Sequence, residues 1–175
     1  MKKLCVAIAV LLFAGLGVRN VEAQAAETES TITVRKLSEE EVAKLKASTG
    51  GMQQIEANTE ISMPTFETTA SYTAHQYSET FGFYEDDTLI ATAEAVCVVW
   101  HYTDGKVHLY SRTIALNYLS SHYASRSYGS IVNTDGSYSY TTGDRIRITN
   151  NLVTRTFALD FFVTSDNADF SCYEV

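Results

Sequence analysis

The sequence predicts an all-β protein, an antiparallel β-sandwich of about eight strands preceded by one short helix. From Thr65 onward β-forming residues dominate, and apolar and polar residues alternate with a period of two. The one proline of the chain, Pro64, stands just before this region, and turn signals divide the region into short runs. Because no helical period lies between the runs, two packed antiparallel sheets are the economical architecture, with a small barrel as the alternative.

Residues 1–25 have the composition of a secretory signal peptide. Two lysines precede an almost wholly apolar stretch, Leu4–Val18, and small residues offer cleavage after Ala23 or Ala25. The apolar stretch of about 15 residues is shorter than the roughly 20 that a membrane-spanning helix needs. We therefore expect a bacterial protein that is secreted or periplasmic and has no membrane attachment after cleavage.

Residues 26–64 are expected to form an N-terminal arm with a short helix at 38–49. Ser38 and Glu41 have the spacing of a capping box, in which each side chain bonds the backbone amide of the other residue. Gly50-Gly51 follows as a helix stop.

The same stretch, residues 36–51, also resembles bacterial peptide leaders that end in Gly-Gly. That resemblance implies a bacteriocin-like product that begins at Met52 after processing. The general signal peptide already provides an export route, so the capped helix is the favoured interpretation.

Residues 65–175 are expected to form the sandwich domain. Thr103-Asp104-Gly105-Lys106 and Asn133–Ser137 are strong hairpin turns. The expected strands are 81–84, 89–102, 107–119, 127–132, 138–141, 145–148, 153–163 and 169–174.

Two cysteines, Cys97 and Cys172, remain once the signal peptide is removed, and in an oxidising compartment they are expected to form a disulfide. Such a bond would contribute roughly 4 kcal/mol by the chain-entropy model. The run Asp166-x-Ala168-x-Phe170-x-Cys172 resembles the stretch before the second cysteine of immunoglobulin variable domains, with Phe170 where that family has tyrosine. Trp100 departs from the family pattern, because it follows Cys97 too closely. The resemblance implies a disulfide-linked, immunoglobulin-like sandwich and no particular activity.

The net charge of −8 at pH 7 argues against nucleic acid and anionic membranes as partners, because both would repel an acidic chain. No cofactor is expected.

His101 and His108 are the candidate metal ligands. A two-residue turn at Asp104-Gly105 would place them opposite each other, close enough to share a Zn²⁺ or Cu²⁺ ion in a metal-binding protein or a hydrolase. A three-residue loop with a glycine bulge would instead oppose His101 to Val107 and put the histidines on opposite faces. Ser120, Ser121 and His122 are adjacent, and adjacent residues on one strand point apart, so no catalytic triad is expected from them.

A segment rich in tyrosine and serine, residues 117–140, is the candidate binding region. Tyrosine offers a large contact area at low entropic cost and serine adapts to a partner, although strand propensity alone also favours tyrosine. The sequence thus favours a secreted, non-enzymatic module that recognises an extracellular protein or glycan, with no oligomeric state indicated. The candidate contact residues are Tyr118, Tyr123, Tyr128, Tyr138 and Tyr140.

Overall fold

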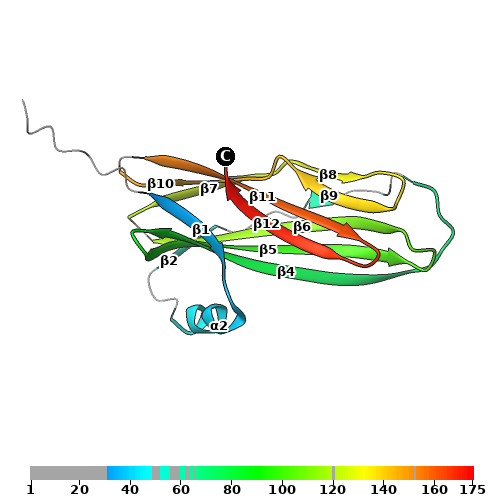
Figure 1. The fold of residues 1–175 in the computed structure, drawn as a ribbon, viewed down its shortest axis with the longest axis horizontal. Coiled ribbons are helices and arrows are strands. Elements are labelled where there is room, and N and C mark those ends of the chain that lie inside the picture. The colour runs from blue at the N-terminus through cyan, green and yellow to red at the C-terminus, as the bar shows by residue number, and fades with distance from the viewer. Residues whose placement is uncertain are drawn as a thin grey trace, which may run out of the picture.

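Two antiparallel β-sheets and one short helix near the N-terminus make up the part of the chain that the structure describes (Figure 1). The computed structural model describes residues 31–48, 52–55, 60–61, 64, 66–119, 121–151 and 153–175. The predicted signal peptide and the Gly50-Gly51 stop lie outside these residues. Within the described chain, no helix is long and apolar enough to cross a membrane.

Sheet A is built on a meander of three long strands with further strands at both edges. Its order is β1-β4-β5-β6-β2, and β3 also pairs with β6. The strands are β1 (Ile32–Lys36), β2 (Met52–Ile55), β3 (Glu60–Ile61), β4 (Tyr72–Glu85), β5 (Thr88–Tyr102) and β6 (Val107–Leu119).

Sheet B has the order β7-β10-β11-β9-β8, with β12 on the other edge of β11. Its strands are β7 (Tyr123–Ser127), β8 (Ser130–Asn133), β9 (Tyr138–Thr142), β10 (Arg145–Thr149), β11 (Thr154–Thr164) and β12 (Ala168–Glu174). β10 pairs with the first half of β11 and β9 with the second half. The chain changes direction between β9 and β10 at Gly143, whose φ of +79° suits a residue without Cβ.

The two sheets share one hydrophobic core, to which both contribute alternate residues of their long strands. Phe83 of β4 and Phe157 of β11, both completely buried, meet edge to face with their ring centroids 4.9 Å apart. Further buried side chains come from Leu116 of β6 and Ile146 of β10. The mostly β architecture with two antiparallel sheets is therefore as the alternating pattern predicts.

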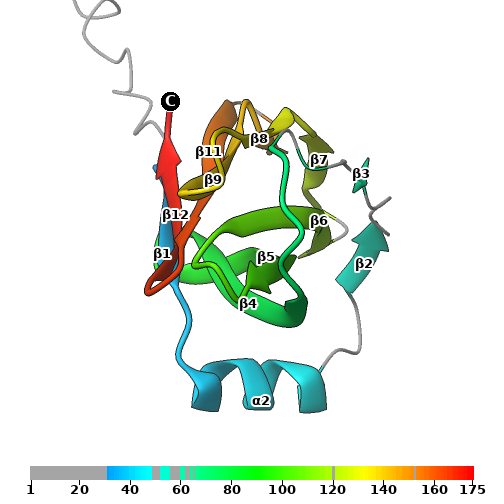
Figure 2. The same cartoon turned by 90° about the vertical axis from the view of Figure 1, so that its right-hand side faces the viewer.

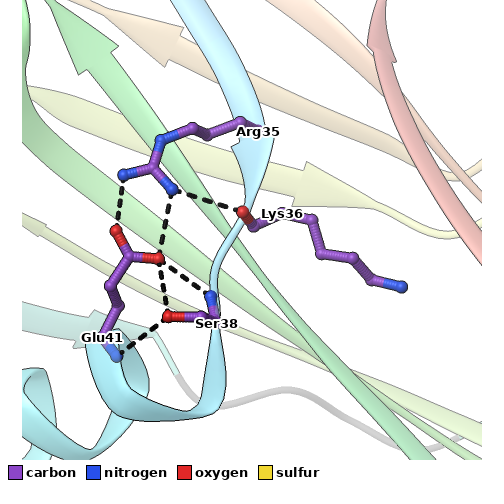
Figure 3. Close-up of polar contacts among 4 residues, drawn as sticks. All are labelled: Arg35, Lys36, Ser38 and Glu41. Atoms are coloured by element: carbon purple, nitrogen blue, oxygen red, sulfur yellow. Dashed lines mark hydrogen bonds and ion pairs between the residues drawn. The ribbon is translucent and has the colours of Figure 1, made fainter.

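The predicted helix is present as α2 (Glu39–Ser48), and its capping box is formed (Figure 3). The Ser38 amide donates to Glu41 at 2.9 Å, and the Glu41 amide donates to the Ser38 hydroxyl at 3.3 Å. Arg35 adds a two-pronged ion pair to the same carboxylate. The helix lies across the face of sheet A that points away from sheet B (Figure 2).

The N-terminal arm is more fully integrated than the sequence suggested. β1 pairs with β4 over five residues, and β2 pairs with β6, so both edges of sheet A are made by residues from the predicted arm. Ile32 of β1 is buried in the shared core. A weak alternation of polar and apolar residues at Thr31–Val34 is the only sequence signal for β1, and it is too short to predict a strand.

The predicted disulfide is absent, because Cys97 and Cys172 are separate thiols. Cys97 lies on β5 of sheet A and Cys172 on β12 of sheet B. Burial raises the pKa of each thiol to about 12. The immunoglobulin-like bond between these cysteines was a wrong expectation, since both behave as small apolar side chains packed in or against the core.

Candidate binding surface

The five candidate tyrosines divide into structural and surface residues. Tyr118 is buried in the core, and Tyr128 packs against it. The Tyr128 hydroxyl accepts hydrogen bonds from the Ile114 amide at 3.4 Å and from Arg126 Nε at 3.2 Å. These two tyrosines therefore hold the sheets together. Tyr123, which is 62 % exposed, begins β7 at the end of sheet B where β7 and β10 pair.

Tyr138 and Tyr140 form the start of an aromatic cluster on the outer face of sheet B. Tyr140 is the direct cross-strand partner of Phe162 on β11 and of Val132 on β8. The Tyr138 ring stacks on Phe162 with a centroid distance of 5.8 Å and on Tyr140 at 6.1 Å. Phe162 is 43 % exposed, while the two tyrosines are half-buried. We call Val132, Tyr138, Tyr140 and Phe162 the aromatic cluster.

Two arginines of β10 occupy the same outer face, where β10 pairs with the first half of β11. Arg145 and Arg147 alternate with the buried Ile146 and Ile148, so both arginines point outward. Ser125, Arg126 and Ser127 of β7 complete, with these arginines, a shallow depression of about 210 Å³. Three arginines line this depression, so it is a locally basic site on a chain whose net charge is −8.

Tyr173 links the two halves of this face. It lies opposite Ala158 on β11, the residue that also pairs with Arg145. Its ring is 48 % exposed, and its hydroxyl donates to Asp160 at 2.8 Å. That hydrogen bond raises the pKa of Tyr173. The outer face of sheet B thus runs from the aromatic cluster through Asp160 and Tyr173 to the arginines.

A buried ion pair fixes the bend on which this face depends. Arg112 of β6 reaches across the core to Asp144, with 2.8 Å between Nη2 and Oδ1, and both side chains are almost completely buried. The same guanidinium donates to the Gly129 carbonyl, and the Gly129 amide donates to Asp144 at 2.7 Å. A Cβ on Gly129 would come within 1.4 Å of the Thr142 carbonyl oxygen, so the two strands can approach this closely only at glycine.

Sequence reasoning missed Phe162, Tyr173, Arg145 and Arg147. A signal for three of these positions was present. Phe162 is an aromatic residue in the polar phase of β11, and the Arg-Ile-Arg-Ile alternation of β10 puts both arginines outside. The pairing of β9 with β11, which brings Phe162 beside the tyrosines, depends on long-range topology that no local pattern encodes.

The hairpin between β5 and β6 takes the second of the two predicted registers. Tyr102 and Lys106 close a three-residue loop that includes Gly105 at φ +83°, and His101 pairs with Val107. His108 pairs with Trp100, is completely buried, and lies with its ring centroid 5.2 Å from that of Trp100. The two histidines point to opposite faces, so the predicted His101–His108 metal pair is not formed.

His101 has a different imidazole neighbour. Its ring centroid lies 4.9 Å from that of His75 on β4, and its Nε2 is 3.0 Å from the Tyr77 hydroxyl. Burial, together with the nearby His75, lowers the pKa of His101. His75 is therefore half of a histidine pair.

Ser121 and His122 come together with a glutamate at the end of the molecule where three turns meet. Ser121 Oγ lies 3.0 Å from His122 Nδ1, and His122 Nε2 lies 3.1 Å from Glu85 Oε2. Asn150 donates to the other oxygen of Glu85 at 2.5 Å. Hydrogen bonds connect Ser121, His122 and Glu85 in series, as in nucleophilic sites, but the serine–histidine bond joins neighbours within one turn. We assign this network the structural role of fastening the turns after β4, β6 and β10. Ser120 lies outside the described residues.

Comparison with known proteins gives no relative from which a function could be transferred: no family model, curated protein or solved structure matches the chain. Among the described residues, no group of three or more His, Cys, Asp or Glu side chains is arranged to hold a metal ion.

Proposed function

We propose that the protein is an exported, non-enzymatic interaction module that binds an extracellular protein through the outer face of sheet B. The observation that carries this proposal is the continuous arrangement of half-exposed aromatic rings and arginines on the outer face of one sheet. Tyrosine, phenylalanine and arginine are the residues enriched in protein interfaces and in their energetic centres. Export is supported by the composition of residues 1–25.

The chemistry of the face defines the partner. The aromatic cluster would pack on an apolar patch, and Arg145 and Arg147 would meet carboxylates next to that patch. A protein surface fits this combination better than a glycan, because sugars stack on open ring faces. In the aromatic cluster, Tyr138 already has a neighbouring ring stacked on it. The shared core of the two sheets also supports a sandwich as the finer description of the fold.

The surface can be tested with a photo-crosslinking amino acid placed at Phe162 and, as a control, at Gln76. Gln76 is exposed on β4 of sheet A, so the two positions probe different sheets. Exposed to the extracellular material of its source, the Phe162 probe should give a discrete protein adduct that excess wild-type protein suppresses. Once the partner is identified, Phe162→Ala and Arg147→Glu should each weaken binding at least tenfold, and Gln76→Ala should leave it unchanged.

Equal crosslinking from both positions would show that the adduct is non-specific and would refute the proposed surface. Binding that survives protease treatment of the partner but is lost after deglycosylation would replace the protein partner with a glycan. Each variant should keep the wild-type circular dichroism spectrum, since the three substituted side chains are exposed in the native fold.

A further inference from the structure

His75 and His101 meet on the face of the β4–β5 ladder that also carries Val99, whereas the aromatic cluster is on the outer face of sheet B. His75 is opposite Val99 and His101 is opposite Thr73, so the two imidazoles are diagonal neighbours on adjacent strands. Their ring centroids are 4.9 Å apart and their planes are inclined by 66°. Tyr77, two residues beyond His75, completes the group with its hydroxyl 3.0 Å from His101 Nε2.

The two imidazoles are accessible to solvent, and Tyr77 next to them packs against the core. β1 pairs with β4 only over Phe81–Glu85, so the part of β4 that holds His75 is at the edge of the paired region of sheet A. The His75 side chain is exposed and that of His101 is half-buried. Tyr77 packs against Phe161 of sheet B with a centroid distance of 6.0 Å, which fixes the phenol relative to the core. An ion could therefore reach the imidazoles from solvent without displacing core residues.

We propose that His75 and His101 together bind one divalent transition-metal ion of the Zn²⁺ or Cu²⁺ class, with Tyr77 as its oxygen neighbour. Imidazole nitrogen is a preferred ligand of both ions and binds zinc at about 2.0–2.1 Å. Rings already in contact can turn about their side-chain bonds until one nitrogen of each faces a common point. Water would occupy the remaining coordination positions, so the ion would be exchangeable.

Tyr77 can contribute to metal binding in two ways. Its phenol oxygen is a possible third ligand, and its hydrogen bond to His101 also orients the ring, as second-shell partners of metal-bound histidines commonly do. Removing the hydroxyl should weaken the site in either case. Removing an imidazole should weaken it more, because one histidine alone cannot chelate the ion.

The test is a titration of the untagged full-length protein with zinc chloride in a calorimeter. Wild-type protein should bind one Zn²⁺ per chain, His75→Ala and His101→Gln should each bind at least tenfold more weakly, and Tyr77→Phe should have an intermediate affinity. With Cu²⁺ the electron paramagnetic resonance spectrum of the wild type should show two coordinated imidazole nitrogens. His75→Ala should show at most one.

His122→Gln is the matched control, because His122 lies at the turn after β6 and is held by Glu85. It should bind Zn²⁺ as the wild type does. A wild-type protein that binds no Zn²⁺ at millimolar concentration would overturn the proposal. Loss of binding in His122→Gln with binding retained in His75→Ala would overturn it as well. Trp100 fluorescence, which reports on the same hairpin, verifies that each variant is folded.

Discussion

At the scale of single residues, the most consequential feature is the pair of opposite charges inside the core. The side chain of Arg112, on β6 of sheet A, is 2 % exposed, and that of Asp144, in the bend between β9 and β10 of sheet B, is not exposed. Burial raises the pKa of Asp144, while its hydrogen bond from the Gly129 amide and its pairing with Arg112 oppose that effect. A buried ion pair contributes little net stability, but a single buried charge is costly. The pair therefore specifies how the two sheets meet at the bend in sheet B.

The Asp144→Asn variant tests this role. It keeps the shape and the hydrogen bond from Gly129 but leaves the Arg112 charge without its anion, and we expect a loss of about 3–5 kcal/mol in the free energy of unfolding. The double variant Arg112→Met/Asp144→Asn should recover part of that loss, because no buried charge remains. Urea denaturation measures both. If the destabilisation of the double variant equals the sum for Asp144→Asn and Arg112→Met measured singly, the two charges act independently and the proposed coupling is wrong.

The conformation of Gly105 explains why His101 and His108 do not form the predicted metal pair. The presence of Gly105 in the left-handed region adds a residue to the β5–β6 loop, and this shifts the cross-strand neighbours of Val99, Trp100 and His101 by one position until an irregularity between Val98 and Val99 reverses the shift. The sequence allowed both registers because Asp-Gly is suited to each of the two turns. Only the pairing of β4 with β5 shows that His101 faces His75.

At the scale of elements, α2 shows how strongly a local signal can specify structure. The helix has no buried residue, so its cap supplies much of what keeps it in place. The hydrogen bond from Arg35, followed by those from Ser38, lowers the pKa of Glu41 to about 2 from an ordinary value of 4.5. Because the folded-state pKa is the lower one, the cap stabilises the helix above pH 4.5 and loses this effect as the pH falls toward 2.

Titration of the Glu41 carboxyl carbon by NMR measures the pKa of Glu41 and so checks the expected shift. The wild-type midpoint should be near pH 2, and Arg35→Gln should move it toward 4.5, because that substitution removes the largest cause of the shift. Lys44→Gln is the control: Lys44 pairs with Glu40 and makes no contribution to the Glu41 shift, so the midpoint should stay where it is. A midpoint near 4.5 in the wild-type protein would contradict the capping arrangement.

The other elements were predictable to the extent that their patterns are local. β5, β6, β11 and β12 follow from period-two alternation and hairpin turns, and the structure has them within a few residues of the expected bounds. β1 was not predictable, because five residues in a polar context carry too little pattern, and its partner is about fifty residues away. The candidate site was half predictable: Tyr138 and Tyr140 followed from composition, while Phe162 became part of it only through the pairing of β9 with β11.

At the scale of the whole molecule, the two sheets bury a single core, and each sheet has one cysteine that faces it. Cys97 is buried in sheet A, and Cys172 is half-buried in sheet B. Since only a thiolate reacts with an alkylating reagent, thiols with pKa values raised to about 12 should be inert in the native protein. Each cysteine is therefore a natural reporter of the unfolding of its own sheet.

We expect both thiols to become reactive at the same urea concentration, because a shared core couples the sheets into one cooperative unit. Alkylation with iodoacetamide at increasing urea, followed by peptide mapping, measures each site separately, without any reductant. Earlier reaction of Cys172 would mean that β12 detaches before sheet A unfolds, as a C-terminal edge strand can. A peptide map in which neither cysteine is alkylated in concentrated urea until a reductant is added would contradict the separate thiols and restore the disulfide. Coincident curves that match the loss of Trp100 fluorescence would establish that sheet A and sheet B unfold in one cooperative transition.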